Sequence, residues 1–278
     1  MVAPPARPWR RAGGGVIDLC RPAGGRVLRI GHRGAAHLAP ENTLEAFRAA
    51  VAVGVDLIEF DVLDLPLGPL VIAHSDHLDE VSHGAASGRV RELTLAQLHE
   101  VAPGLLTLDE ALAFFTTEAP AVGLHIDLKL QVRLDELVHA IVRHRLAPRT
   151  VVSSFHVPSL RAIAQSAPEV RIGLTYPEDR LSVSRRPVLW PLVSLGLSAL
   201  RASIPYRIGS MLRAAGAGAV MLQHRLVTSR AVEQAHAHGA PVLAWTVDER
   251  PDLERVLAAG VDGVITNDPR IFTATLAA

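Results

Sequence analysis

Polar side chains stand at the ends of four short apolar runs in this chain of 278 residues. Seven such residues are found: His32 and Arg33 follow the first run, Glu59 and Asp61 end the second, His74 ends the third, and Asp127 and Lys129 end the fourth. Glu59 and Asp61 are two residues apart, as are Asp127 and Lys129, so each pair lies on one face of its strand. In a parallel barrel the carboxyl ends of the strands open on one rim. We therefore expect the whole set to meet at one mouth.

These residue types suit the chemistry of a phosphate ester. Three carboxylates supply oxygen ligands for one hard divalent cation, Mg2+ or Ca2+. Arg33 can grip phosphate oxygens and Lys129, the only lysine of the chain, adds a point charge. His32 and His74 can act as an acid/base pair, although the sequence does not say which is the acid. The sequence contains no Gly-rich phosphate loop in a strand–helix context and no Gly-x-Ser-x-Gly elbow.

The elements that must position these residues alternate between strand and helix patterns. Apolar or β-branched runs predict nine strands: residues 26–31, 57–61, 70–74, 123–129, 150–155, 170–176, 219–223, 241–246 and 262–266. Helical periodicity predicts helices over 42–53, 95–101, 108–115, 134–144, 228–238 and 251–259. Eight strand–helix units in this length fit a closed (β/α)8 barrel, the TIM barrel, with an open doubly wound sheet as the alternative. One candidate strand must be extra, and we suspect 219–223.

Composition narrows the class of protein. The chain carries 28 basic and 28 acidic residues, and this balance gives no support to nucleic-acid binding. A single cysteine, Cys20, excludes an intramolecular disulfide and a Cys-based zinc cluster. We expect a flexible N-terminal tail over 1–25 and a single catalytic barrel domain over 26–278, with a longer apolar insert near 178–216. No protein partner is identifiable from the sequence.

The insert contains a charge-free apolar segment, residues 188–200, with Arg185 and Arg186 before it and Arg201 after it. The segment is too short to span a membrane. Flanking arginines and an interfacial Trp190 suit a segment that rests on lipid headgroups, so we expect a helical cap beside the site mouth that favours acylated substrates. The protein is expected to be cytoplasmic, with any peripheral membrane contact made through 188–200.

The ordered motifs resemble those of the glycerophosphodiester phosphodiesterase family. The matching segments are His-Arg-Gly at 32–34, Pro-Glu-Asn-Thr at 40–43, Glu-Phe-Asp at 59–61, the strand ending at His74, Leu-Thr-Leu-Asp-Glu at 106–110, Ile-Asp-Leu-Lys at 126–129, Ser-Ser-Phe at 153–155, Trp-Thr-Val-Asp at 245–248 and the segment 260–267. They keep the family's order over nearly the whole chain. The resemblance implies a (β/α)8 barrel of the phosphodiesterase type.

It also implies an activity, the metal-dependent hydrolysis of a glycerophosphodiester, a small molecule, to glycerol 3-phosphate and an alcohol. By position, His32 and His74 are similar to the family's acid/base pair. Glu59, Asp61 and Asp127 correspond to its metal ligands. Arg33, Lys129, Glu41 and Trp245 correspond to residues that bind substrate, with Trp245 in the glycerol pocket and Glu41 orienting its neighbours.

Three departures from the family pattern bear on function. Asp127 stands where the family usually has Glu, Ser75 separates His74 from Asp76, and residues 64–68 replace the usual turn after the second strand. Two other functions therefore stay open. One is a lysophospholipase D-type phosphodiesterase that acts on lysophospholipids at a membrane surface, for which the apolar segment is the motive. The other is a weakly active barrel that only binds phosphodiesters.

Overall fold

The computed structural model describes residues 17–21, 25–178 and 190–275, with the backbone alone described at 190–195, 197, 274 and 275. Eight parallel strands pair in a closed ring, because β1 bonds to both β2 and β9. Around the ring they are β1 (Leu28–Gly31), β2 (Leu57–Asp64), β4 (Gly123–Leu128), β5 (Thr150–Ser154), β6 (Arg171–Tyr176), β7 (Ala219–Gln223), β8 (Val242–Trp245) and β9 (Gly263–Thr266). The prediction of a (β/α)8 barrel is confirmed, and the open sheet is excluded.

The ninth strand, β3 (Leu70–Ile72), lies outside the ring and pairs antiparallel with the end of β2. Our choice of 219–223 as the extra strand was therefore wrong, because that segment is the barrel strand β7. The connection from β2 to β3 is only five residues long, which suits a hairpin, whereas a parallel crossover needs about a dozen or more. His74 thus reaches the mouth on a returning hairpin arm and not at the end of a barrel strand.

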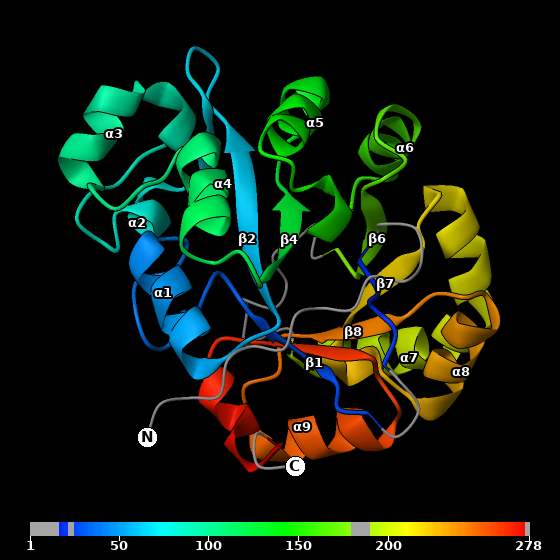
Figure 1. Cartoon of the computed structure of the whole chain (residues 1–278). Helices are drawn as coiled ribbons and strands as arrows, with labels where there is room; N and C mark the ends of the chain where they lie inside the picture. The colour runs from blue at the N-terminus through cyan, green and yellow to red at the C-terminus, as the bar shows by residue number, and fades with distance from the viewer. Residues whose placement is uncertain (1–16, 22–24, 179–189, 276–278) are drawn as a thin grey trace.

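Helices cover the outside of the barrel (Figure 1). Their bounds are α1 (Leu44–Val53), α2 (Leu78–Val81), α3 (Leu95–Val101), α4 (Leu108–Thr117), α5 (Leu134–Arg143), α6 (Val157–Ser166), α7 (Trp190–Ala215), α8 (Ser229–Ala237) and α9 (Arg250–Ala258). Short 3-10 turns are η1 (Val90–Glu92), η2 (Ala147–Arg149), η5 (His224–Leu226) and η6 (Pro269–Thr275). Thr94 and Thr107 are the N-caps of α3 and α4 and form complete capping boxes there, and both helices lie where periodicity predicts them.

Apolar packing accounts for the architecture. Each strand is buried on both faces, with the helices outside and the other strands inside. Four phenylalanines lock α1 and α4 onto β2, with ring centroids 5.4–5.8 Å apart: Phe47, Phe60, Phe114 and Phe115. The hairpin of β2 and β3 forms a smaller core of its own with α2 and α3. This unit of the β2–β3 hairpin, α2 and α3, which we call the hairpin insert, stands beside the mouth and carries His74.

Two expectations concern the parts between and before the strands. Ile17 and Leu19, from the segment expected to be a flexible tail, are buried beneath the barrel. Of the apolar segment 188–200, Val188 and Leu189 lie outside the described residues, as do the side chains of 190–195 and 197, so the expected cap beside the mouth stays a prediction. No helix in the described part of the chain is long and apolar enough to cross a membrane.

Candidate active site

Three carboxylates meet at the mouth of the barrel. Glu59 and Asp61 project from β2 and Asp127 from the neighbouring β4, where Asp61 and Asp127 are paired in register. One oxygen from each lies within 4.8 Å of the others, and all three residues are buried. This is the set that the sequence predicts as metal ligands. Oxygen donors at this spacing and without a sulfur or imidazole ligand fit a hard divalent cation.

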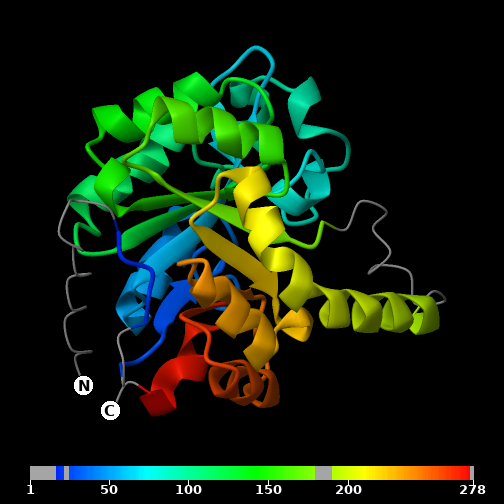
Figure 2. The same ribbon diagram turned by 90° about the vertical axis from the view of Figure 1, so that its right-hand side faces the viewer.

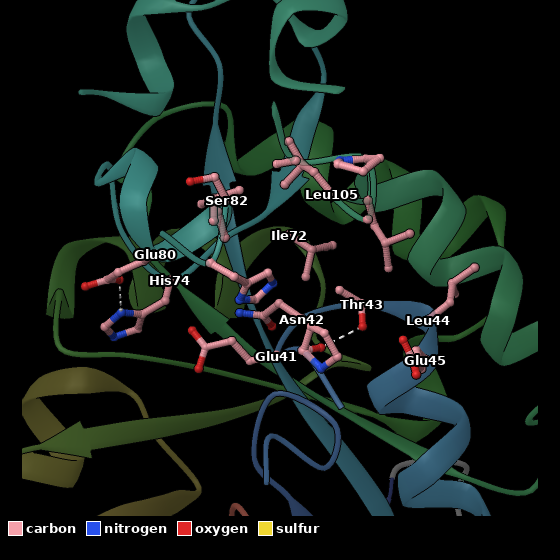
Figure 3. A pocket seen from close by; sticks show the side chains of 18 of the residues that line it. Glu41, Asn42, Thr43, Leu44, Glu45, Ile72, His74, Glu80, Ser82 and Leu105 are labelled. Carbon is pink, nitrogen blue, oxygen red and sulfur yellow. Dashed lines mark hydrogen bonds and ion pairs between the residues drawn. The ribbon is translucent and has the colours of Figure 1, made fainter. Parts of the chain in front are cut away.

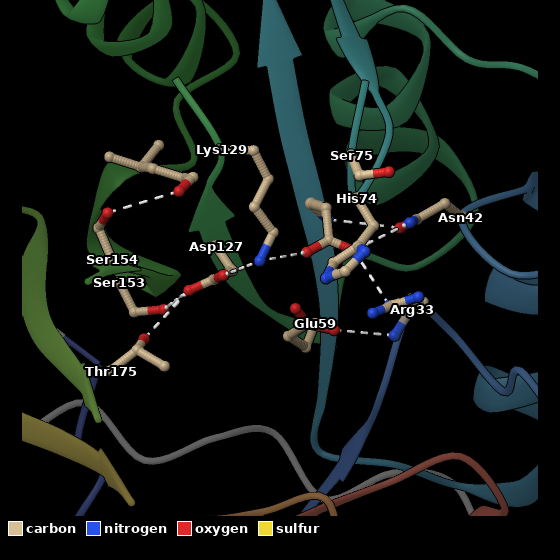
Figure 4. A network of polar contacts seen from close by, with 12 residues as sticks. Arg33, Asn42, Glu59, His74, Ser75, Asp127, Lys129, Ser153, Ser154 and Thr175 are labelled. Atoms are coloured by element: carbon tan, nitrogen blue, oxygen red, sulfur yellow. Dashed lines mark hydrogen bonds and ion pairs between the residues drawn. The ribbon is translucent and has the colours of Figure 1, made fainter. Parts of the chain in front are cut away.

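Two cations of the protein lie against the carboxylates (Figure 4). Lys129 Nζ is 2.5 Å from Asp127 Oδ2 and 3.1 Å from Asp61 Oδ1, and Arg33 Nε is 3.2 Å from Asp61 Oδ2. Burial alone would raise the pKa of Asp61, but Lys129 and Arg33 outweigh it and hold that pKa well below its usual range. Asp61 is therefore ionised at any physiological pH.

Glu59 behaves in the opposite way. Burial, followed by the negative charges of Asp61 and Asp127, raises its pKa well above the ordinary value. The backbone N–H of Arg33 donates to Glu59 Oε2 over 2.8 Å, which offsets only part of this effect. A cation among the three carboxylates would relieve the repulsion, so the donor set fits a divalent ion on electrostatic grounds as well as by geometry.

The turn after β1 places Arg33 by means of unusual backbone conformations. Arg33 and Asn42 both have positive φ, 50° and 60°. Gly34 has φ 88°, and a Cβ there would lie 2.8 Å from the Cβ of Ala46, so α1 packs directly on this turn. The Asn42 side chain then donates to Asp61 Oδ2 over 3.0 Å, and Glu41 accepts from Arg33 Nη1 over 2.7 Å.

His32 is oriented by a short hydrogen-bond chain. Asn267 Nδ2 donates to Asp248 Oδ2 over 2.7 Å, since a carboxylate oxygen can only accept. Asn267 Oδ1 is therefore left to accept from His32 Nδ1–H, 2.6 Å away, so the proton of neutral His32 lies on Nδ1. Nε2 carries the free lone pair and lies 3.9 Å from Glu59. Burial and then the charge of Arg33 lower the pKa of His32 to about 4.

His74 has a charged partner instead. Its Nδ1 donates to Glu80 Oε2 over 3.2 Å, and Ser75 Oγ donates to the same oxygen over 2.7 Å. Glu80 belongs to α2, so the hairpin insert supplies both the histidine and the carboxylate that orients it. Ser75, one of the departures from the family pattern, thus helps to hold Glu80 in place. Asp76 points elsewhere and pairs with Arg89.

Asp127, the shorter replacement for the family's glutamate, is held by side chains of the next two strands. Ser153 Oγ on β5 donates to Asp127 Oδ1 over 2.5 Å, and Thr175 Oγ1 on β6 donates to the same oxygen over 3.1 Å (Figure 4). Because the Ser153 hydroxyl hydrogen is used, His125 Nε2–H must donate to Ser153 Oγ, 2.8 Å away. Oδ2 of Asp127 stays turned toward Lys129.

Nearly all the predicted residues line one cavity of about 480 Å3. The exception is Glu41, which reaches the site through Arg33 and lines an adjoining cavity of about 410 Å3 beside His74 and Glu80 (Figure 3). Trp245 forms part of the apolar wall of the first cavity. Its ring is fixed there by two contacts: Nε1 donates to the Met221 carbonyl over 2.9 Å, and the ring packs edge-on to Phe155.

The sequence reasoning missed the residues that hold these groups in place: Asn42, Glu80, His125, Ser153, Thr175, Asp248 and Asn267. Four of them lie inside segments that resemble the family's motifs, and that position could have marked them: Asn42, Ser153, Asp248 and Asn267. Nothing in the local pattern marked Glu80 or Thr175, because their partners are brought to them by the fold.

The fold and the charged side chains at its mouth define a class: a β/α-barrel enzyme with its site at the carboxyl ends of the strands. A model of the glycerophosphoryl diester phosphodiesterase family matches residues 32–271. The chain therefore belongs to this family and is an enzyme, a hydrolase of phosphodiesters.

Individual relatives agree. A glycerophosphodiester phosphodiesterase of Caldanaerobacter subterraneus is 29% identical over 88% of this chain and 95% of its own, and a probable glycerophosphodiester phosphodiesterase 1 of Mycobacterium tuberculosis is 30% identical over 88% and 90%. A crystal structure from Silicibacter pomeroyi, described as a "putative glycerophosphoryl diester phosphodiesterase", superposes with TM-score 0.73 at 27% identity. The superposition covers 93% of this chain and 95% of the other. A phosphodiesterase of Oleispira antarctica in complex with the product sn-glycerol-3-phosphate shares the fold, with TM-score 0.68 at 20% identity over 91% and 98%.

Proposed function

We propose that the protein hydrolyses glycerophosphodiesters to glycerol 3-phosphate and an alcohol by metal-assisted acid/base catalysis. The observation that carries the proposal is the meeting of two oriented histidines, two cations and three carboxylates in one cavity of about 480 Å3. Membership of the glycerophosphodiester phosphodiesterase family supports the substrate class.

The three carboxylates are proposed to hold one divalent cation, Mg2+ or Ca2+. Such an ion would offset negative charge on the phosphoryl oxygens in the transition state. Asp127 is shorter than the usual glutamate, yet its oxygen lies within 4.8 Å of those of Glu59 and Asp61. This spacing favours an active enzyme over a barrel that only binds its ligand.

The two histidines are proposed to have different roles because their partners differ. His32 donates from Nδ1 to a neutral amide, so its free Nε2 can accept a proton from the attacking water. His74 donates from Nδ1 to the Glu80 carboxylate, the partner that best stabilises an imidazolium. We therefore assign His32 as the base and His74 as the acid. Water attacks phosphorus, the phosphorus–oxygen bond to the alcohol breaks, and His74 protonates the departing oxygen.

The remaining predicted residues are proposed to bind substrate. Arg33 and Lys129 lie at the edge of the carboxylate cluster, where they can reach phosphoryl oxygens. Glu41 fixes the Arg33 guanidinium through its 2.7 Å contact. Trp245 offers the apolar wall against which the carbon chain of glycerol can pack.

A direct test is the release of glycerol 3-phosphate from glycerophosphocholine with and without a chelator. We expect activity to be lost on exhaustive chelation and restored by Mg2+ or Ca2+. His32→Ala and His74→Ala should each lose about 10²–10⁴-fold in kcat, whereas His139→Ala, an exposed histidine on α5, should not. Undiminished activity after chelation would contradict the metal site.

The acid and base assignments are separated by a leaving group that needs no proton. With a p-nitrophenyl ester of glycerol 3-phosphate, His74→Ala should lose much less activity than with glycerophosphocholine. His32→Ala should lose about as much with both substrates, since the base is needed in each case. The reverse pattern would exchange the two roles.

The lysophospholipase D alternative is tested by the same assay with lysophosphatidylcholine. The side chains that motivate it lie mostly outside the described residues, within 188–200. A clear preference for the acylated substrate would favour this alternative over a glycerophosphodiesterase.

A further inference from the structure

The basic residues are distributed unevenly in this neutral chain. Residues 180–232 contain eight arginines and no Asp or Glu, although the whole chain has 28 basic and 28 acidic residues. The rest of the molecule therefore carries a matching acidic excess. A segregation of this kind points to an anionic partner for the basic part.

Four of these arginines lie on the outer helices α7 and α8: Arg201, Arg207, Arg213 and Arg230. All four are exposed, and none forms an ion pair with a residue of the described part of the chain. Arg230 stacks over the ring of Tyr206, 4.6 Å from its centroid, and the Tyr206 residue is 72% exposed. Tyr206, Arg213 and Arg230 line one cavity, and Arg201 and Arg207 lie on preceding turns of α7. We call these four arginines and Tyr206 the arginine surface.

Other exposed arginines behave differently. Arg48 pairs with Glu118, Arg250 pairs with Glu254, and Arg143 pairs with a carboxylate of α4. The positive charge of those sites is thus locally compensated, whereas the charge of the arginine surface is not. Uncompensated positive charge attracts polyanions within a Debye length, about 10 Å at 0.1 M salt.

A cavity within the arginine surface adds a place for a phosphate group. It has a volume of about 330 Å3 and lies between α7 and α8, with Tyr206, Ser210, Arg213, Arg230 and His238 among its lining residues. No Asp or Glu lines it. The Ser210 hydroxyl donates to the Arg207 carbonyl over 2.7 Å, which leaves two guanidinium groups and an imidazole as donors for phosphate oxygens.

The position of α7 relates the arginine surface to the catalytic mouth. α7 is the next helix after β6, and Pro177, just after that strand, lines the active-site cavity. The second half of α7 packs on α8 through Ile204, Ile208 and Leu212, while its first half projects away from the barrel (Figure 2). In sequence, the projecting half is uncharged until Arg201.

We propose that the arginine surface docks the protein on anionic lipid bilayers, with a lipid phosphate bound between Arg213 and Arg230. A lipid surface is favoured over nucleic acid because the arginines accompany an exposed aromatic ring and an uncharged apolar helical segment. Tyrosine at the headgroup level beside arginines is typical of interfacial helices. This docking does not depend on the reaction proposed above.

Vesicle flotation of the full chain tests the proposal. Wild type should float with vesicles of phosphatidylcholine containing 30% phosphatidylglycerol and not with pure phosphatidylcholine, and binding should disappear at 1 M NaCl. At about 1 kcal/mol for each arginine near an anionic surface, the triple variant Arg207→Gln/Arg213→Gln/Arg230→Gln should bind roughly 100-fold more weakly.

The matched control is Arg48→Gln/Arg143→Gln/Arg250→Gln, which removes the same charge from α1, α5 and α9. It should keep wild-type vesicle binding, and both triple variants should hydrolyse glycerophosphocholine in solution at the wild-type rate. Equal losses in the two triple variants, or wild-type binding that ignores phosphatidylglycerol, would overturn the proposal. Tighter binding of duplex DNA or RNA than of vesicles at the same salt would also overturn it and assign the surface to nucleic acid.

Discussion

Asp127 shows how a short side chain is held within the carboxylate cluster that we propose binds the metal. Ser153 and Thr175 both donate to its Oδ1, which leaves Oδ2 to Lys129. Hydrogen bonds to a charged acceptor contribute about 1.5–3 kcal/mol, and partners that orient metal ligands typically change metal affinity about 10–100-fold.

We predict that Ser153→Ala/Thr175→Val binds Mn2+ about 10–100-fold more weakly in calorimetry and needs correspondingly more metal for half-maximal activity. The turnover at saturating metal should change little, because neither hydroxyl has to contact substrate. Ser154→Ala is the control, since Ser154 donates to the Leu128 carbonyl and not to Asp127. An unchanged Mn2+ affinity in the double variant would show that Asp127 does not need this support.

At the scale of single residues, the sequence predicted which side chains gather at the mouth but not what orients them. Strand alternation and the rule that active sites lie at strand ends were sufficient for Glu59, Asp61 and Asp127. Asn267 contacts His32 from 235 residues away because the ring of strands closes. Glu80 contacts His74 from 6 residues away because the hairpin insert folds back on itself. Periodicity carries no information about them.

At the scale of elements, the misassigned extra strand had a physical signal. Only five residues separate β2 from β3, too few for a parallel crossover, whereas the long helix α7 gives β7 ample room for one. Connection length therefore distinguishes hairpin strands from barrel strands where apolar periodicity does not. The consequence is functional, because the hairpin and α2 together deliver His74 and Glu80.

One buried cation joins several elements without touching the site. Arg149, 8% exposed, donates to the carbonyls of Phe115, Ala119, Pro120 and Val122, and so ties the end of α4 to the start of β5. Burial lowers its pKa to about 10. The guanidinium thus offsets its desolvation with four carbonyl contacts.

We predict that Arg149→Met lowers the free energy of unfolding by about 2–4 kcal/mol, because buried carbonyls lose their donors. Arg149→Lys should recover part of the loss, since an ammonium keeps the charge but reaches fewer acceptors. Urea denaturation measures both, with Arg161→Met, an exposed position on α6, expected within about 0.5 kcal/mol of wild type. Equal stability of the Arg149→Met and Arg161→Met variants would contradict this role.

At the scale of the whole molecule, the two ends of the barrel are built for different purposes. The mouth holds the charged cavity, whereas the opposite end is filled by Ile17 and Leu19, which pack with Leu57, Val151 and Leu243 inside the strands. The backbone of this segment is anchored as well, since Arg171 Nη2 donates to the Ile17 carbonyl over 3.3 Å. Closure of the barrel core at this end therefore depends on residues upstream of β1.

We predict that Ile17→Ala and Leu19→Ala each lower the free energy of unfolding by about 2–5 kcal/mol, the range for truncating fully buried aliphatic side chains. Because the cavity they leave is at the end of the barrel away from the carboxylate cluster, kcat for glycerophosphocholine per folded molecule should stay near wild type. Cys20→Ala, at an exposed position of the same segment, should change neither quantity. A lower kcat per folded molecule in the Ile17 or Leu19 variant would show that this end of the barrel also shapes the catalytic mouth. An unchanged unfolding transition would show that residues 17–19 add nothing to the stability of the core.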